Sequence, residues 1–152
     1  MIGVRQVRGF TLIELLVVFS IIALLVGLVP IAFDKVRDSA QYRDVLRSMV
    51  AEMRGARFRA LSERAEVRFQ VDLAQRSFGI DGRPQHAIPD SLEMRATVAD
   101  NELSAQNVAA IRFLPDGGAT GGSIDVIRAS GAGVRLKVDW LSGQVRQEPL
   151  VP

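Results

Sequence analysis

The stretch VRGFTLIELLVVFSIIALLVGLV, residues 7–29, decides the fold because it is long and apolar and contains a single carboxylate. Glu14 is the only ionisable residue between positions 10 and 33. About twenty consecutive apolar residues suffice to cross the hydrocarbon core of a bilayer, so residues 10–33 are predicted to form a transmembrane helix. A carboxylate at the centre of such a span costs roughly 2.5–3.5 kcal/mol, so Glu14 calls for a functional explanation.

The residues on either side of this run favour a retained anchor whose N-terminus lies in the cytoplasm. A secretory signal would have a shorter apolar region followed by an A-x-A-like cleavage site. The segment VPIAFDKVRD, residues 29–38, contains no such site. Arg5 and Arg8 precede the run without an acidic residue, and positive charge favours the cytoplasmic side. We therefore expect one membrane span, with the bulk of the chain on the far side.

The composition restricts what the rest of the chain does. About 120 residues remain beyond the anchor, enough for one modest domain. The 19 basic residues are scattered among 17 acidic ones, which argues against nucleic-acid binding. The absence of cysteine excludes disulfides and thiolate chemistry, and a single histidine, His86, cannot build a histidine metal site. We therefore expect no metal and no cofactor, with His86 as a loop residue.

A helical pattern continues beyond the anchor. Apolar residues recur at spacings of three and four, as Tyr42, Leu46, Met49, Met53, Ala56 and Ala60. This stripe predicts that residues 34–62 are an amphipathic continuation of the helix that packs on the chain's own globular domain. Anchor and stripe should form one helix to about Leu61. Pro30 lacks an amide donor, so a kink or a locally melted turn is expected there.

The periodicity then changes to the alternation typical of strands, so residues 63–152 are predicted to form a β-rich domain. The strand candidates are EVRFQVD (66–72), SFGID (77–81), SLEMRATV (91–98), VAAIRFL (108–114), GSIDVIRA (122–129), VRLKVDW (134–140) and GQVRQE (143–148). Residues 81–90 and 99–107 are expected to be connections, and 148–152 a frayed tail. The predicted fold is α+β, a long N-terminal helix followed by a mostly antiparallel sheet domain.

Two stretches resemble a known family. GFTLIELLVV, residues 9–18, resembles the signature of type IV pilin precursors and their pseudopilin relatives. IRFLPDGGATGGSIDV (111–126) and VRLKVDWLSGQVR (134–146) resemble the H-type minor pseudopilins of type II secretion. The resemblance implies a pilin-like fold and a non-enzymatic structural subunit of the pseudopilus, which helps to export folded proteins across the outer membrane. It also implies a bacterial inner-membrane anchor and a periplasmic C-terminal domain.

The resemblance also implies roles for particular residues. Residues 1–9 would be a leader that prepilin peptidase removes between Gly9 and Phe10, with methylation of the new Phe10 amine. Glu14 would be the counter-charge for the Phe10 amine of a neighbouring subunit, and an unpaired carboxylate in such a helix bundle is penalised. The alternative is that Glu14 reaches the membrane interface or stabilises its own helix N-terminus. The implied partners are other major and minor pseudopilins, prepilin peptidase and the inner-membrane assembly platform.

The loop PDGGATGG, residues 115–122, has two interpretations. Its glycines give it little stiffness and few apolar contacts, which predicts a mobile segment. In the functional interpretation it is a partner-docking loop that orders on assembly, with Asp116, Gly117, Gly118 and Thr120 as the candidate residues. In the other it is a plain hairpin turn whose glycines supply positive φ angles. The loop lacks the Lys-Ser/Thr pair of a phosphate cradle, so phosphate binding is not expected.

Two other functions remain open at this point. The first is a subunit of a type IV pilus or of a DNA-uptake pseudopilus, and the absence of cysteine leans away from major pilins with a C-terminal disulfide. The second is a membrane-anchored periplasmic enzyme. That function would need a nucleophile–base pair or paired carboxylates, and the aspartates are instead spread singly over turns and strands.

Overall fold

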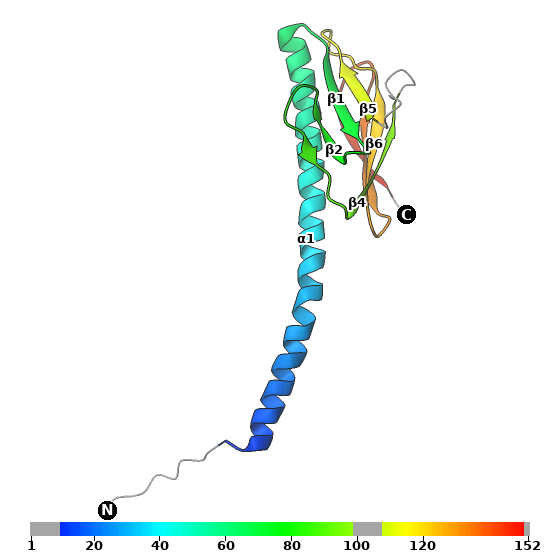
Figure 1. Ribbon diagram of the computed structural model, residues 1–152. Helices are drawn as coiled ribbons and strands as arrows, with labels where there is room; N and C mark the ends of the chain where they lie inside the picture. Colours follow the sequence, from blue (N-terminus) through cyan, green and yellow to red (C-terminus); the bar gives the residue numbers. More distant parts are fainter. Residues whose placement is uncertain (1–9, 99–107, 151–152) are drawn as a thin grey trace, which may run out of the picture. The chain divides into compact units, whose positions relative to one another are not determined.

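A computed structural model describes residues 10–98 and 108–150, with side chains outside residues 27–36 (Figure 1). One helix, α1 (Leu12–Glu63), precedes all the described strands. These strands are β1 (Val67–Asp72), β2 (Ser77–Ile80), β3 (His86–Ala87), β4 (Leu92–Thr97), β5 (Val108–Phe113), β6 (Gly122–Arg128), β7 (Gly133–Val138) and β8 (Val145–Leu150). The predicted α+β architecture is confirmed. The chain forms two compact units, Met1–Ser39 and Ala40–Pro152, and α1 begins in the first and ends in the second.

The strands form two antiparallel sheets of four strands each. The first has the order β3-β2-β1-β5 and the second β4-β6-β7-β8. Several strands that are neighbours in the sequence form hairpins: β1 pairs with β2, and β6, β7 and β8 pair in succession. Two pairings join strands that are distant in the sequence, β1 with β5 and β4 with β6.

A single core lies between the second half of α1 and the sheets. The predicted stripe is buried at Tyr42, Met49, Met53, Ala56 and Ala60, and Leu46 is partly buried against the same core. The sheets contribute mainly aromatic and β-branched side chains, namely Phe69, Phe78, Phe113, Ile111, Ile124 and Val126. Full burial of one methionine side chain contributes roughly 1.5–3 kcal/mol, so the stripe anchors this helical segment firmly to the sheets.

Helix α1 follows the expectation except at Pro30. It is continuous through Pro30, so the melted turn, one of the two expected outcomes, does not occur. It ends at Glu63, close to the predicted Leu61, where Arg64 adopts a φ of 51°. A residue in the left-handed region directly after a helix turns the chain away and ends the helical hydrogen bonding. Among the described residues, no helix is long and apolar enough to cross a membrane.

One loop prediction and the prediction of a frayed tail were wrong. His86 lies in the short strand β3, paired with Phe78, and the two rings stack with centroids 5.2 Å apart. Its Nε2 lies 3.4 Å from the Glu52 Oε1 atom, so β3 is held by its ring contacts as well as its backbone. The predicted frayed tail instead continues β8 to Leu150, with Pro149 opposite Val134. Proline is compatible with this position because β8 is an edge strand.

Candidate functional site

The head of α1 is closed by reciprocal hydrogen bonds between Thr11 and Glu14. The Glu14 amide donates to the Thr11 hydroxyl over 3.3 Å. Glu14 Oε2 accepts from both the Thr11 amide and the Thr11 hydroxyl, each at 3.1 Å. The Leu15 amide donates to the Thr11 carbonyl over 3.2 Å. This is a capping box, in which an N-cap threonine and a glutamate three residues later satisfy amides that the helix leaves without partners.

The capping box uses only part of the Glu14 carboxylate. Over the described residues, no hydrogen bond reaches the second oxygen, Oε1. The surrounding side chains offer no cover, since Phe10 is 82% exposed and the apolar residues after it are exposed as well. The structure therefore gives Glu14 a role in its own helix, as one of the two sequence interpretations held, and leaves Oε1 open to a second partner. Gly9, the other half of the predicted cleavage site, lies outside the described residues.

The glycine-rich loop is fastened by hydrogen bonds. The Gly118 amide donates to Asp116 Oδ1 over 2.9 Å. The Thr120 amide donates to the Arg112 carbonyl over 2.9 Å, and the Thr120 hydroxyl accepts from the Arg112 amide over 3.0 Å. Gly117 and Gly118 are buried. Backbone groups, the Asp116 carboxylate and the Thr120 hydroxyl therefore hold a loop whose glycines give it little stiffness of its own.

Arg57 on α1 ties this loop to the turn between β7 and β8. Its Nε donates to the Ser142 carbonyl over 2.9 Å and to the Gly117 carbonyl over 3.3 Å. Gly143 packs beside this contact with a φ of 61°. A Cβ atom at Gly143 would lie 2.5 Å from the Gly117 oxygen and 3.1 Å from the Arg57 side chain. We call Arg57, Gly117, Ser142 and Gly143 the arginine clamp. The sequence interpretation missed Arg57, which lies off the apolar stripe.

The β7–β8 turn is shaped by Asp139 and carries exposed apolar side chains. Asp139 Oδ1 accepts from both the amide and the hydroxyl of Ser142 at 2.8 Å, and these hydrogen bonds hold the pKa of Asp139 below its ordinary value. Trp140 and Leu141, at the tip, are 68% and 71% exposed. The Trp140 carbonyl accepts from the Ala119 amide over 2.9 Å. The turn and the glycine-rich loop thus form one surface on which Trp140 and Leu141 project outward.

The predicted residues therefore fall at two separate places. Glu14 and Phe10 lie at the head of α1, and Asp116, Gly117, Gly118 and Thr120 lie at the arginine clamp. In the part of the chain that the structure describes, no group of three His, Asp or Glu side chains is placed to hold a metal ion.

Comparisons with known proteins point in one direction. The model of the prokaryotic N-terminal methylation motif matches residues 4–30, and the model of type II transport protein GspH matches residues 46–143. A relative from Xanthomonas campestris pv. campestris, type II secretion system protein H, is 36% identical over 146 residues, covering 96% of this chain and 86% of the relative. The minor pseudopilin EpsH from the type 2 secretion system of Vibrio cholerae has a similar fold. Its TM-score is 0.57 at 10% identity, over 72% of this chain and 97% of EpsH.

Proposed function

This chain belongs to the family of type II transport protein GspH, and we propose that it acts as a minor pseudopilin anchored in the bacterial inner membrane. The observation that carries the function is the match of the GspH model over residues 46–143. A minor pseudopilin is a structural subunit of the type II secretion pseudopilus, so its partners are other pseudopilins. We propose that it acts by assembling with these partners and not by catalysis.

The anchor is proposed to be a single span formed by residues 10–33, with a cytoplasmic N-terminus and a periplasmic C-terminal domain. Its support is the apolar run of the sequence, the arginines at positions 5 and 8, and the N-terminal methylation motif at residues 4–30. Residues 34–62 would then carry the helix from the membrane to the β-rich domain, residues 63–152.

Processing is proposed to occur at the boundary between Gly9 and Phe10. Prepilin peptidase would remove residues 1–9 on the cytoplasmic side and methylate the Phe10 amine, and the inner-membrane platform would then assemble the mature subunit. The methylation-motif match includes both residues. Cleavage creates a cation one residue before the capping box, which places positive charge at the head of the helix that carries Glu14.

Glu14 is proposed to have two tasks, and the two oxygens of its carboxylate allow both. Oε2 is used by the capping box of its own helix. Oε1 would accept the Phe10 amine of a neighbouring subunit. In a membrane the capping bonds lower the free-energy cost of the Glu14 carboxylate before the subunit assembles. A buried charge is tolerated only when hydrogen bonds and an opposite charge compensate it.

The glycine-rich loop is proposed to contribute to docking indirectly. Asp116, Gly117, Gly118 and Thr120 would hold the shape of the clamp, while Trp140 and Leu141 on the adjoining turn supply apolar contact area to another pseudopilin. Large exposed aromatic side chains are typical anchors of protein interfaces. A minor type IV pilin or DNA-uptake subunit could use the same surfaces, and the match to the GspH model favours type II secretion over both.

Processing offers a direct test of the proposal. Gly9→Val should leave the precursor uncut, because a peptidase pocket that accepts glycine before the scissile bond cannot admit a branched side chain. Mass spectrometry of the membrane fraction should show the wild-type chain shortened by residues 1–9 and the variant at full length. Gly55→Val, the same change at a position on α1 with nothing within 4 Å of its Cβ, should be processed normally. A trimmed Gly9→Val chain, or a wild-type chain that keeps its leader, would contradict the proposal.

A further inference from the structure

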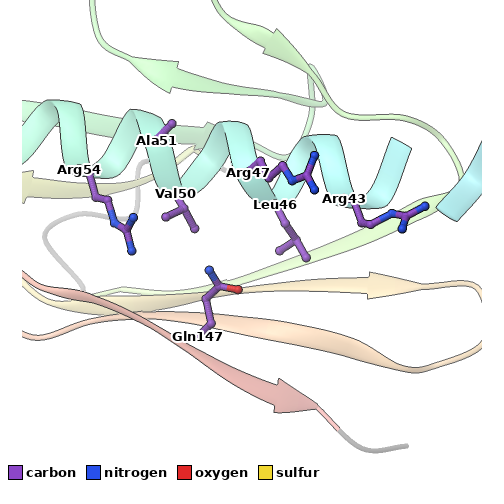
Figure 2. A pocket seen from close by; sticks show the side chains of 7 residues that line it. All are labelled: Arg43, Leu46, Arg47, Val50, Ala51, Arg54 and Gln147. Carbon is purple, nitrogen blue, oxygen red and sulfur yellow. The ribbon is translucent and has the colours of Figure 1, made fainter. Parts of the chain in front are cut away.

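An arginine-rich groove runs between one flank of α1 and the edge strand β8 (Figure 2). Its volume is about 390 Å³. Arg43, Arg47 and Arg54 line it from the helix, Val50 forms part of its apolar floor, and Gln147 faces it from β8. A second hollow of about 320 Å³ shares Arg54 and extends the groove to the β7–β8 turn. We call these two hollows together the β8 groove.

The charge of the β8 groove is of one sign. Among the residues that the structure describes, its lining includes four arginines and no acidic residue. Within the described part of the chain, Arg47 and Arg54 make no hydrogen bond or ion pair, whereas Arg57 is occupied by the clamp. Residues four and seven positions apart lie on the same flank of a helix, so Arg47 and Arg54 present their guanidinium groups to the same side. The groove therefore offers two uncompensated cations above an apolar floor.

The other wall of the groove has unpaired backbone groups. Among the described strands, β8 is the last of its sheet and pairs with β7 alone. The Asp139 amide donates to the Gln144 carbonyl over 3.0 Å, which starts the ladder of this hairpin. Hydrogen-bonded and non-hydrogen-bonded pairs alternate in antiparallel sheets, so the backbone groups of Val145, Gln147 and Pro149 point away from β7. Two amides and three carbonyls along the edge of β8 thus have no hydrogen-bond partner among residues 10–98 and 108–150.

From these two walls we infer that the β8 groove binds an extended acidic segment of a partner protein, which adds as a further strand beside β8. Its backbone would pair with the open groups of Val145 and Gln147, and its carboxylates would meet the arginines. Pro149 has no amide to offer, so the pairing would end there. Strand addition of this kind draws affinity from the backbone and specificity from alternate side chains.

The spacing of the arginines fits a strand with an acidic residue at every second position. Arg47 and Arg54, the two uncompensated cations, are about 10.5 Å apart along the helix axis. Alternate residues of a strand are about 6.6–6.8 Å apart, and residues four apart about 13 Å. Long arginine side chains span the remaining differences. A second copy of this chain is a poor occupant, because pairing of two β8 edges would bring two arginine grooves together.

The β8 groove lies within the unit Ala40–Pro152. Peptide binding there does not depend on Glu14 or on cleavage at Gly9, so an experiment can contradict the groove proposal without contradicting the proposed function, and the reverse. The probe is a fluorescent, terminally blocked peptide of eight residues in which Glu alternates with Val and Thr. It is titrated against the full chain in neutral detergent micelles, and binding is followed by fluorescence anisotropy. The double change Arg47→Glu with Arg54→Glu should weaken binding by about tenfold or more, because two charge-assisted contacts become repulsive.

Arg146→Glu is a control for the same kind of charge reversal outside the groove. Arg146 lies on β8 between Val145 and Gln147, and alternation places it on the opposite face of the strand. Binding of the peptide to this variant should stay within about twofold of wild type. Equal losses for Arg146→Glu and for the double variant would show a diffuse charge effect and overturn the inference, as would the absence of any binding to the wild-type chain.

Backbone pairing is tested with two N-methylated forms of the same peptide. One is methylated on its Glu residues and the other on the residues between them, so the charge is equal. Only one set of amides can face β8, so one form should lose binding and the other should keep most of it. Equal binding by both forms would exclude strand addition. If vesicles containing an anionic lipid also displaced both forms, with the same dependence on Arg47 and Arg54, the groove would be a headgroup site instead.

Discussion

The arginine clamp predicts a large cost for adding one methyl group at Gly143. Gly143 has a φ of 61°, and a Cβ atom there would lie 2.5 Å from the Gly117 oxygen. Gly82 provides the matched control, because it has a φ of 73° and nothing within 4 Å of its Cβ position. Alanine at Gly82 therefore meets only the backbone penalty, whereas alanine at Gly143 meets the same penalty and a collision with backbone.

The two magnitudes follow from these differences. A non-glycine residue in the left-handed region costs about 1–2 kcal/mol, and the smaller entropy of the unfolded chain returns about 0.4–1 kcal/mol. Gly82→Ala should thus lower the free energy of unfolding by about 1 kcal/mol. Backbone shifts forced by overpacking cost about 1–3 kcal/mol more, and the Arg57 hydrogen bonds lengthen as the Gly117 carbonyl moves. Gly143→Ala should therefore cost about 3 kcal/mol in total.

Urea unfolding of the full chain in neutral detergent micelles measures both variants. Trp140, the only tryptophan, lies at the β7–β8 turn and accepts the Ala119 amide at its carbonyl, so its fluorescence reports on the clamp. Circular dichroism in the same samples shows whether the rest of the domain unfolds with it. A Gly143→Ala variant within about 0.5 kcal/mol of Gly82→Ala would refute the reasoning, since the expected gap of about 2 kcal/mol comes from the collision alone.

Two further predictions concern the same domain. A chain beginning at Asp34 should be a soluble monomer with a mixed helix and strand spectrum, because its core needs no residue of the anchor; a purely helical spectrum would contradict the fold. Replacement of Gly117, Gly118 and Thr120 together by alanine should lower the free energy of unfolding by about 3 kcal/mol or more. The reasons are the φ of 94° at Gly117, a Cβ contact of 3.1 Å between position 118 and the Trp140 carbonyl, and the lost Thr120 hydroxyl. An unchanged free energy of unfolding in urea would instead support the mobile loop that the sequence predicts.

The periodic elements of this fold could be predicted from the sequence because burial of a face imposes a period. The helical stripe from Tyr42 to Ala60 and the alternation of β1 both appear in the structure as buried faces. The division into two sheets could not be predicted, since β5 pairs with β1 and β4 with β6 across long connections that carry no local signal. His86 was assigned to a loop because β3 has only two residues, too few to show a period.

The two candidate sites differ in how far they can be predicted from the sequence. Thr11-Leu-Ile-Glu14 is a capping-box pattern, so the bonds at the head of α1 were predictable from the sequence. The arginine clamp was not, because Arg57 bonds to backbone carbonyls that lie 60 and 85 residues further along the chain. Every residue has a backbone carbonyl. The sequence therefore does not distinguish an arginine that bonds to carbonyls from one that is exposed to solvent.

The most direct test of the assembly role of Glu14 is the incorporation of Glu14→Gln into the pseudopilus. Glutamine can still accept the Thr11 hydrogen bonds of the capping box but carries no charge, so the variant separates capping from pairing. Loss of one partner of a buried ion pair costs about 3–5 kcal/mol, which predicts at least a hundredfold loss of incorporation. The measurement is co-purification of the mature variant with other pseudopilins, alongside its cleavage and the secretion it supports. We expect Glu14→Gln to be cleaved normally and to lose co-purification and secretion as fully as Glu14→Ala does. Co-purification of Glu14→Gln at the wild-type level would show that Glu14 serves only its own helix.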